Sequence, residues 1–490
     1  MARALPPAWL ALFLCAYAAL KAGFGVLICD DAYITLSHAR SLAEGLGPVM
    51  SARNPVCATS TPLYTLLLAG ESLLLRTANF ETLAFATNLV FDAAGLFFVH
   101  RLAGGLGLSG PFRLAAVSAY GLSVSFLAVS AFGMETPLYA ALALAGTYYR
   151  CYSEKPFPGL LTVCFLAPLV RPEGALLPAV LILSGLRRGE GWGRTLACAA
   201  AAALGLALFF GFYQLAYGRW LPHSVVAKRL ELRVGALESL ESWILNVFYK
   251  GPSFGGRAVV TVANLLAAAA AAWGFARRPG GPVPWALLAW PCAYILFFLA
   301  TRSSYALFTW YYLPVLPFAI LFLVAGLRRL VPLGKANGSA WAILFAFLVY
   351  VPVQTFLQGI PQKHRFAKQA REDRYLAAAR ILDAGSPPGS QVMVDEVGAL
   401  GYFSRMKILD THGLLSPEAL PFLGGSADHW SRMDALQERF RPLWIMGMRP
   451  VSREGRLEEG EGAVLSGYRL EHALRLAPHP YLVEMWRREN

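Results

Sequence analysis

The chain has few charged residues for its length. Only 15% of its 490 residues are Asp, Glu, Lys or Arg, whereas 56% are hydrophobic, and the mean hydropathy is +0.48. Soluble domains usually carry about 25% charged residues, so a series of soluble domains is excluded. Disorder is excluded as well, because apolar residues dominate. The composition therefore indicates a multi-pass membrane protein.

Acidic residues are scarce relative to basic ones. The chain has 43 Lys and Arg against 30 Asp and Glu, which gives a net charge of +13. In a membrane protein such an excess marks the cytoplasmic ends of the spans, so we expect no nucleic-acid partner. None of the seven cysteines forms a CxxC pair, which argues against zinc and thioredoxin-type sites.

Apolar runs predict eleven transmembrane helices, since a span needs about 20 apolar residues. We expect them at 8–28, 82–99, 112–130, 137–149, in two arms of 158–186, and at 195–217, 258–275, 284–300, 311–327 and 340–357. Arg171–Gly174 divides the run 158–186, and Lys21 is expected to extend from the first span toward the membrane surface. The run Pro62–Leu75 has only 14 residues and is expected to lie along that surface.

The charges near the span ends set the orientation. With the N-terminus inside, thirteen basic and two acidic residues lie at the inner ends, as the positive-inside rule requires. The basic residues are Arg3, Arg101, Arg113, Arg150, Lys155, Arg187, Arg188, Arg194, Arg277, Arg278, Arg328, Arg329 and Lys335, and the acidic ones are Glu154 and Glu190. Eleven spans then place the C-terminus outside.

The last part of the chain is polar and predicts a separate domain. We expect residues 1–360 to form the transmembrane module and residues 361–490 an extracytoplasmic domain of ordinary size. A helical pattern covers 365–382, and strands are expected at 392–394, 406–409, 443–446, 469–476 and 481–485. The expected fold class is therefore an α-helical polytopic membrane protein with a C-terminal α/β domain.

Polar residues gather at the outer ends of the spans, which places the expected site on the outer face. Asp30 and Asp31 follow the first span. Adjacent carboxylates repel each other and partial desolvation adds to this, so one of them would suit a general base. The alternative is a pair of solvated acids at a helix end. We expect Asp30 to be the base, because it lies nearer the membrane, and Asp31 to brace the loop, with Arg40 as a candidate partner.

The other outer residues are expected to hold the substrate. Arg171 is a candidate ligand for a phosphate group, and the alternative is a plain loop in which Arg171 reaches the surface. Glu135 begins a span, where a carboxylate is also favourable without any function. The remaining candidates for substrate binding are Arg40, Glu173, His223, Lys228, Arg302 and Tyr305. No cofactor is assigned; a divalent metal is the one candidate, and Asp395, Asp410 and His412 offer too few ligands to place it.

Several of these segments resemble a known family. Asp30–Ile34, Ala39–Gly45 and Ser60–Tyr64 are similar to the first outer loop of GT-C glycosyltransferases, and closest to the bacterial branch that contains the terminal arabinofuranosyltransferases of cell-wall arabinan. Similar to the same branch are Phe132–Pro137, Arg171–Gly174, Leu221-Pro222, Gly398–Tyr402 and Asp410–Leu414. The loop departs from that branch at Pro55–Thr59, which leaves the sugar and the acceptor open.

The resemblance implies a glycosyltransferase of the bacterial inner membrane. It would move a sugar from a polyprenyl-phosphate carrier to a hydroxyl of a glycan, lipid or protein on the outer face, with Asp30 or Asp31 as the catalytic residue. The residues agree independently, because a lipid phosphate leaving group requires cations near the membrane surface. The alternative is a lipid-linked-sugar flippase or another transporter, which would predict repeated halves and acids deep within several spans.

The topology can be tested by labelling single cysteines. Cysteines placed at Arg188 and Arg329 should be shielded from an impermeant thiol reagent in intact cells, whereas one at Gly455 should react, because the charge bias puts the first two inside. The reverse pattern would contradict both the topology and an outward-facing site.

Overall fold

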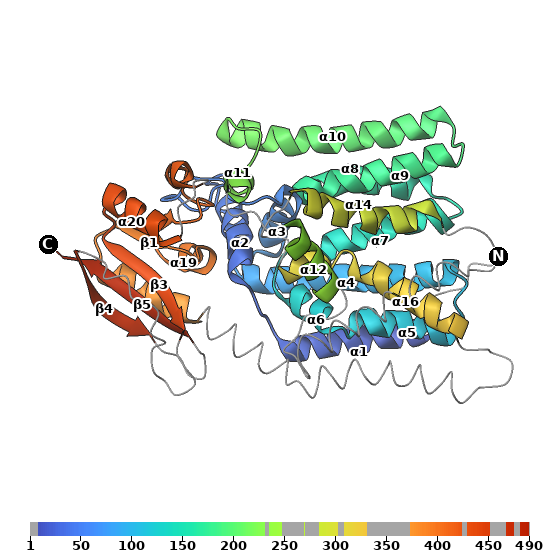
Figure 1. Ribbon diagram of the computed structural model, residues 1–490, viewed down its shortest axis with the longest axis horizontal. Helices are drawn as coiled ribbons and strands as arrows, with labels where there is room; N and C mark the ends of the chain where they lie inside the picture. The colour runs from blue at the N-terminus through green and yellow to red at the C-terminus, as the bar shows by residue number, and fades with distance from the viewer. Residues whose placement is uncertain are drawn as a thin grey trace. The chain divides into compact units, whose positions relative to one another are not determined.

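The computed structural model describes residues 8–230, 235–246, 269, 284–301, 308–330, 373–423, 429–450, 467–474 and 481–489. This part of the chain is mostly α-helical and has one small sheet near the C-terminus (Figure 1). The chain divides into two compact units. Met1–Val26, Ala84–Phe209 and Arg233–Pro361 form the first unit, and Leu27–Leu83, Phe210–Leu232 and Gln362–Asn490 form the second.

Apolar helices dominate the first unit, and Figure 1 shows most of them running side by side. Those that lie wholly or largely within it are α1 (Ala8–Phe24), α4 (Phe80–Gly105), α5 (Gly110–Gly121), α6 (Val124–Ala131), α7 (Thr136–Tyr152), α8 (Phe157–Val170), α9 (Leu176–Arg187), α10 (Trp192–Tyr217), α12 (Ala236–Asn246), α14 (Trp285–Thr301), α15 (Thr309–Tyr312) and α16 (Leu316–Leu330).

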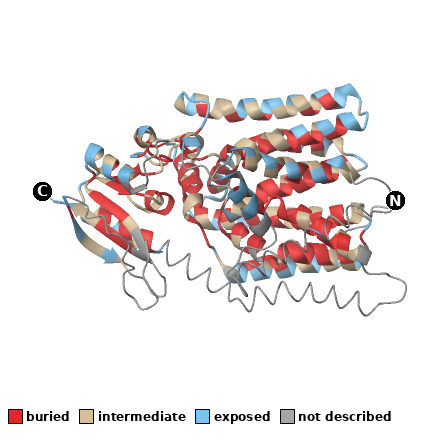
Figure 2. Ribbon diagram, in the orientation of Figure 1, coloured by how far each residue is buried: buried red, intermediate tan, exposed pale blue. Residues whose placement is uncertain are grey.

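Two described helices, α4 and α10, are long and apolar enough to cross a membrane, with 26 residues each. A third span results if α5 and α6, which meet at a bend of 51°, are taken together. The expected count of eleven spans therefore stays a prediction, and the runs 258–275 and 340–357 lie outside the described residues, residue 269 excepted. Helix α10 exposes Leu196 (61%) and Leu204 (54%), and Figure 2 shows little buried surface along it. Such a surface suits contact with lipid.

The divided run 158–186 forms a helical hairpin, as its sequence predicts. Helices α8 and α9 are joined by a short 3-10 turn at Pro172–Ala175. A Cβ on Gly146 of α7 would lie 2.9 Å from both Val163 and Leu181, so the two arms are level with each other and run in opposite directions. Gly174 lies so close to α8 that a Cβ would be 2.0 Å from the Ala167 carbonyl oxygen. The turn therefore requires glycine at this position.

Lys21 does not extend to the surface, contrary to the sequence-based expectation. Its side chain is 1% exposed, and Nζ lies 2.5 Å from Asp92 Oδ2 in α4. The Tyr17 hydroxyl donates to the same oxygen over 2.9 Å. A nearby carboxylate explains this, because two opposite charges buried together satisfy each other where either alone would be costly.

The second unit contains two helices of the first outer loop, α2 (Asp30–Ala43) and α3 (Pro62–Leu75), as well as α11 (His223–Leu230). Helix α3 has the predicted bounds, and Arg76 ends it in the left-handed conformation (φ 52°). Three successive leucines at its end are exposed by 62%, 81% and 63%. The placement of α3 along a membrane surface stays a prediction.

The C-terminal part of the second unit folds around a five-stranded sheet. The strands β1 (Gln391–Val394), β2 (Lys407–Asp410), β3 (Trp444–Pro450), β4 (Tyr468–Leu474) and β5 (Tyr481–Arg488) are all at the predicted places and have the order β2-β1-β3-β5-β4. The first three are mutually parallel, and β5 is antiparallel to both β3 and β4. The expected helix is present at 373–384, whereas residues 365–372 lie outside the described ranges.

Two buried layers fix this sheet. Met393, Leu409 and Ile445 lie side by side on adjacent strands and pack on Met433 and Leu436. The latter two belong to α20 (His429–Phe440), next to η3 (Pro417–Phe422). The short helix α19 (Gly398–Phe403) connects β1 to β2. The alternating neighbours Val392, Val394 and Ile408 are also buried, as in a sheet that is covered on both faces.

Candidate active site

The two aspartates of the first outer loop form the first turn of α2. Cys29 precedes them in extended conformation, and its carbonyl oxygen accepts the N–H groups of Ala32 and Tyr33. Carboxylates are favourable at this end of a helix because the N–H groups of the first turn carry partial positive charge. Both side chains are half-buried, so the sequence pattern and the local structure agree here.

Asp30 binds the backbone at the start of α19. Its Oδ2 accepts the N–H of Gly398 over 2.9 Å, and its Oδ1 accepts the N–H of Ala399 over 2.8 Å. A Cβ on Gly398 would lie 1.7 Å from the Asp30 carbonyl oxygen, so only glycine permits this approach. Both carboxylate oxygens of Asp30 are therefore engaged in holding α19.

Asp31 has a different environment. Within the ranges that the structure describes, its carboxylate makes no hydrogen bond or ion pair. Consecutive residues of a helix point about 100° apart, so Asp31 is directed away from the contact that Asp30 makes. Asp30, expected from the sequence to be the base, thus makes bracing contacts of the kind expected of Asp31.

Arg40 contacts α19 rather than either aspartate. Its Nη2 donates to the Tyr402 carbonyl oxygen over 3.0 Å, and the guanidinium carbon lies 4.1 Å from the centre of the Tyr402 ring. Tyr33 adds ring contacts to Tyr402 and Phe403 at 5.0 and 5.2 Å. The guanidinium is thus used to pack α2 on α19, which is a structural role.

His38 is a buried residue that the sequence analysis missed. Its Nδ1 lies 2.7 Å from the Ile34 carbonyl oxygen, and its Nε2 lies 3.1 Å from the N–H of Ala58. Because that N–H can only donate, Nε2 accepts and Nδ1 carries the proton. Burial lowers the pKa of His38 to about 4, so the ring is neutral at physiological pH. It ties α2 to the chain that follows Val56.

The outer segment after α10 contributes His223 and Lys228. The backbone N–H of His223 donates to the Cys57 carbonyl oxygen over 3.3 Å, and its Nδ1 lies 3.4 Å from Arg219 Nη1. Burial, helped by the Arg219 charge, lowers the pKa of His223 to about 4. Lys228 lies in the last turn of α11 and is half-buried. Both belong to the same unit as Asp31.

A second group of predicted residues comes together in the first unit. Arg171 is 3% exposed, and its Nε donates to Glu135 Oε1 over 2.6 Å. Its Nη1 lies 3.6 Å from Glu173 Oε1. The sequence placed these three residues in one site, and the structure does bring them into one cluster. The two carboxylates already neutralise the guanidinium.

Neighbouring residues complete the shell around Arg171. Nη2 donates to Thr136 Oγ1 over 2.6 Å, and Nη1 lies 3.4 Å from the Tyr294 hydroxyl. The rings of Tyr139 and Tyr311 lie 5.7 and 5.3 Å from the guanidinium carbon. Sequence reasoning did not identify these partners, since they come from helices far apart along the chain. With such a shell, Arg171 holds the hairpin turn against α7 and α14.

The remaining candidates divide into two sets. Arg302 and Tyr305 lie outside the described residues. In the C-terminal part, Asp410 is buried and accepts the N–H groups of His412 and Leu415 over 2.8 Å each; burial raises its pKa to about 6. Thr411 donates to Asp395. These carboxylates shape the loop after β2, and the described residues contain no group of three His, Cys, Asp or Glu side chains that could hold a metal ion.

Comparisons with known proteins are consistent with this architecture. A family model described as a domain of unknown function (DUF8728) matches residues 363–486. No curated protein matches the chain. ArnT from Cupriavidus metallidurans in the apo state is similar over 98% of both chains, with a TM-score of 0.57 and 14% identity.

Two further solved structures are similar. ArnT from the same organism bound to undecaprenyl phosphate gives a TM-score of 0.56 at 13% identity, again over 98% of both chains. Arabinofuranosyltransferase AftD from mycobacteria gives 0.57 at 16% identity, over 99% of this chain but 40% of that chain. The similarity over nearly the whole chain shows the GT-C fold, which the sequence resemblance implied.

The Arg171 cluster predicts a loss of stability when the cation is removed. Arg171→Ala would leave Glu135 and Glu173 buried without their partner, so the free energy of unfolding should fall by about 3–5 kcal/mol. Arg171→Lys should lose less, because a point charge replaces one of the contacts but not the fork. Unfolding of the purified variants in detergent measures both. Unchanged stability together with weaker donor binding would instead support the phosphate-binding interpretation.

His38 predicts a dependence of stability on pH. Its pKa of about 4 in the folded chain lies below the ordinary value of 6.5, so the unfolded chain binds the extra proton. The contribution of His38 to stability should be complete above pH 6.5 and fall as the pH drops toward 4, by about 3 kcal/mol. Unfolding of the wild type and of His38→Gln across this range tests the prediction. His223→Gln serves as the comparison, because its pKa is lowered to about 4 as well.

Proposed function

We propose that the chain is a membrane glycosyltransferase that moves a sugar from a polyprenyl-phosphate carrier to a hydroxyl group of a cell-envelope acceptor. The acceptor would be a glycan, a lipid or a protein on the outer face of the bacterial inner membrane. The observation that carries the proposal is the carboxylate of Asp31, directed away from a braced Asp30 in the first outer loop of a GT-C fold.

The similar structures support the chemistry. One of them holds undecaprenyl phosphate and covers 98% of both chains, and another is an arabinofuranosyltransferase. A chain with the same fold is therefore a reasonable host for a lipid-phosphate donor, although fold alone does not fix an activity. The sugar would be a pentose or a hexose, because the first outer loop departs from the arabinofuranosyltransferase branch at Pro55–Thr59.

Asp31 is proposed as the general base. The acceptor hydroxyl attacks the anomeric carbon of the donor and loses its proton to the Asp31 carboxylate. The bond between the anomeric carbon and the phosphate oxygen breaks, and the polyprenyl phosphate leaves with the electron pair. Asp30 is less suited to this role, because each of its oxygens already accepts a backbone N–H that holds it against α19.

Stabilising the leaving phosphate requires a cation. We assign this role to Lys228, with Arg302 as a further candidate, and we keep His223 and Tyr305 as proposed substrate contacts. Arg40, Glu135, Arg171 and Glu173 are proposed to act through packing and ion pairing. Arg171 pairs with Glu135 and Glu173, and Arg40 donates to a backbone carbonyl oxygen, so they would shape the site rather than bind the donor directly.

A flippase is less well supported than a transferase. A transporter would place ionisable residues deep in several spans. In the described helices of the first unit, Asp92 lies in the middle of α4 and Lys21 neutralises it, whereas Glu135 precedes α7 and Glu173 lies in the turn before α9. We therefore propose the transferase, with the N-terminus inside and the domain of residues 361–490 outside.

The roles of the two aspartates can be separated by kinetics. Asp31→Asn keeps the shape and removes the base, so turnover of a polyprenyl-phosphate sugar should fall about 10²–10⁴-fold. It should also remove the acidic limb of the pH profile of kcat/KM. Asp30→Asn should keep that limb, and its cost should include about 1–3 kcal/mol of stability because one N–H loses its acceptor.

The assay is donor consumption by the purified full chain, with several polyprenyl-phosphate pentoses and hexoses. If Asp30→Asn removes the acidic limb and Asp31→Asn keeps it, the roles are the other way round. If the wild type consumes none of the donors, the proposed activity is wrong.

A further inference from the structure

In the part of the chain that the structure describes, four residues of the first outer loop form hydrogen bonds with the C-terminal α/β domain, all within the second unit. Two of them are Asp30, whose carboxylate binds the start of α19, and Arg40, whose guanidinium binds the end of α19. The other two lie farther along the loop, at Arg53 and Asn54. Together they cover residues 30–54, the segment that begins with the catalytic candidates.

Asn54 fills the open edge of the sheet. Strand β2 is an outer strand of the order β2-β1-β3-β5-β4, so one side of its backbone lacks a strand partner. The Asn54 side chain donates from Nδ2 to the Met406 carbonyl oxygen over 3.3 Å, and its Oδ1 accepts the N–H of Ile408 over 3.0 Å. One buried amide thus supplies both a donor and an acceptor, as a neighbouring strand would.

The loop presents this amide in a fixed orientation. The backbone N–H of Asn54 donates to Ser51 Oγ over 3.1 Å, and Asn54 Nδ2 lies 3.3 Å from the same oxygen. Asn54 is 4% exposed. A buried amide with all of these partners cannot turn without leaving polar atoms unpaired, so the contact fixes both the loop and the strand edge.

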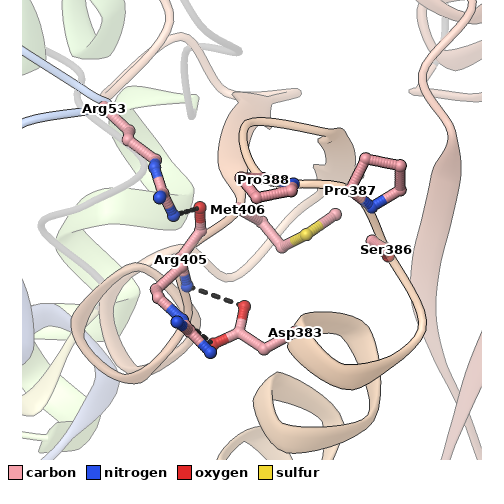
Figure 3. A pocket seen from close by; sticks show the side chains of 7 residues that line it. All are labelled: Arg53, Asp383, Ser386, Pro387, Pro388, Arg405 and Met406. Atoms are coloured by element: carbon pink, nitrogen blue, oxygen red, sulfur yellow. Dashed lines mark hydrogen bonds and ion pairs between the residues drawn. The ribbon is translucent and has the colours of Figure 1, made fainter.

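Arg53 makes a further contact between the loop and the domain, at the surface beside Asn54. Its guanidinium donates to the Arg405 carbonyl oxygen, and the Arg405 N–H donates to Asp383 Oδ1 over 2.8 Å. Figure 3 shows these residues around a cavity of about 110 Å³, with Ser386 and two prolines on the far side. The cavity is small, Arg405 pairs with Asp383 and Arg53 donates to a carbonyl oxygen, so we assign it to the contact between the loop and the domain and not to a ligand site.

We propose that the C-terminal domain positions the catalytic loop, with Asn54 and Gly398 as positioning residues for the transfer reaction. This rests on the proposed function of Asp31. Helix α19 acts on Asp31 through its neighbour. Asp30 is fixed by two N–H groups of α19, and Asp31 is the next residue of the same helix. Fixing one therefore fixes the direction of the other. The β2 edge holds the far end of the loop through Asn54.

Gly398 offers the sharpest test. Gly398→Ala places a methyl group where 1.7 Å separates it from the Asp30 carbonyl oxygen, so α19 must withdraw from α2. Gly447→Ala is the matched control, because a Cβ there meets nothing within 4 Å in the same domain. Asn54→Ala is the second variant and opens the other contact without adding bulk.

Two measurements on the full chain decide the proposal. Steady-state kinetics with a polyprenyl-phosphate sugar that the wild type consumes should show kcat lowered about 10–100-fold in Gly398→Ala and Asn54→Ala, the scale of a misplaced catalytic group. The donor KM should stay close to the wild-type value, and Gly447→Ala should match the wild type. Hydrogen exchange of residues 30–44 should become faster in Gly398→Ala and stay the same in the control.

Three results would overturn the proposal. One is wild-type kcat in both folded variants, and another is a raised acceptor KM at constant kcat, which would make the domain an acceptor-binding element. The third is failure of both variants to fold, which would make the contacts purely structural. If the wild type consumes no donor, the transferase function fails, whereas the exchange of residues 30–44 still decides whether the domain holds the loop.

Discussion

The described site depends on the hydrogen bonds between the Asp30 carboxylate and the start of α19. The two carboxylate oxygens need donor partners, and the N–H groups of Gly398 and Ala399 provide them across 368 and 369 positions of sequence. The contact is possible because Gly398 has no Cβ. From it follow the packing of α2 on α19, the position of Arg40 over Tyr402 and the direction of the neighbouring Asp31.

The second constraint is that buried charged residues of the first unit lie next to charges of opposite sign. Arg171, Glu135 and Glu173 look like ligands in a sequence because ionised groups near a membrane are costly. In the structure they compensate one another. Lys21 and Asp92 do the same deeper in the first unit. Each of these five charged residues therefore has an oppositely charged partner within the protein.

Some features could be predicted because their cause is local. The five strands are bounded by turns and carry apolar runs, the hairpin breaks where proline and glycine follow Arg171, and α3 begins at a proline and ends at Leu75. The resemblance in the first outer loop also led to the fold that the solved structures share. The eleven spans, the orientation and the domain boundary near residue 360 stay predictions.

Sequence by itself determined the membrane class, the five strands, the divided hairpin and helix α3, because composition and periodicity act over a few neighbouring residues. Only tertiary structure decided what the outer polar residues do. Asp30 and Asp31 are adjacent and chemically identical, and the difference between them comes from α19, which lies more than 350 positions away. Asn54 and His38 gave no signal in the sequence, and Gly398 appeared only as part of a segment that resembles the family, because a hydrogen-bond partner or a close backbone approach exists only once distant segments have packed together.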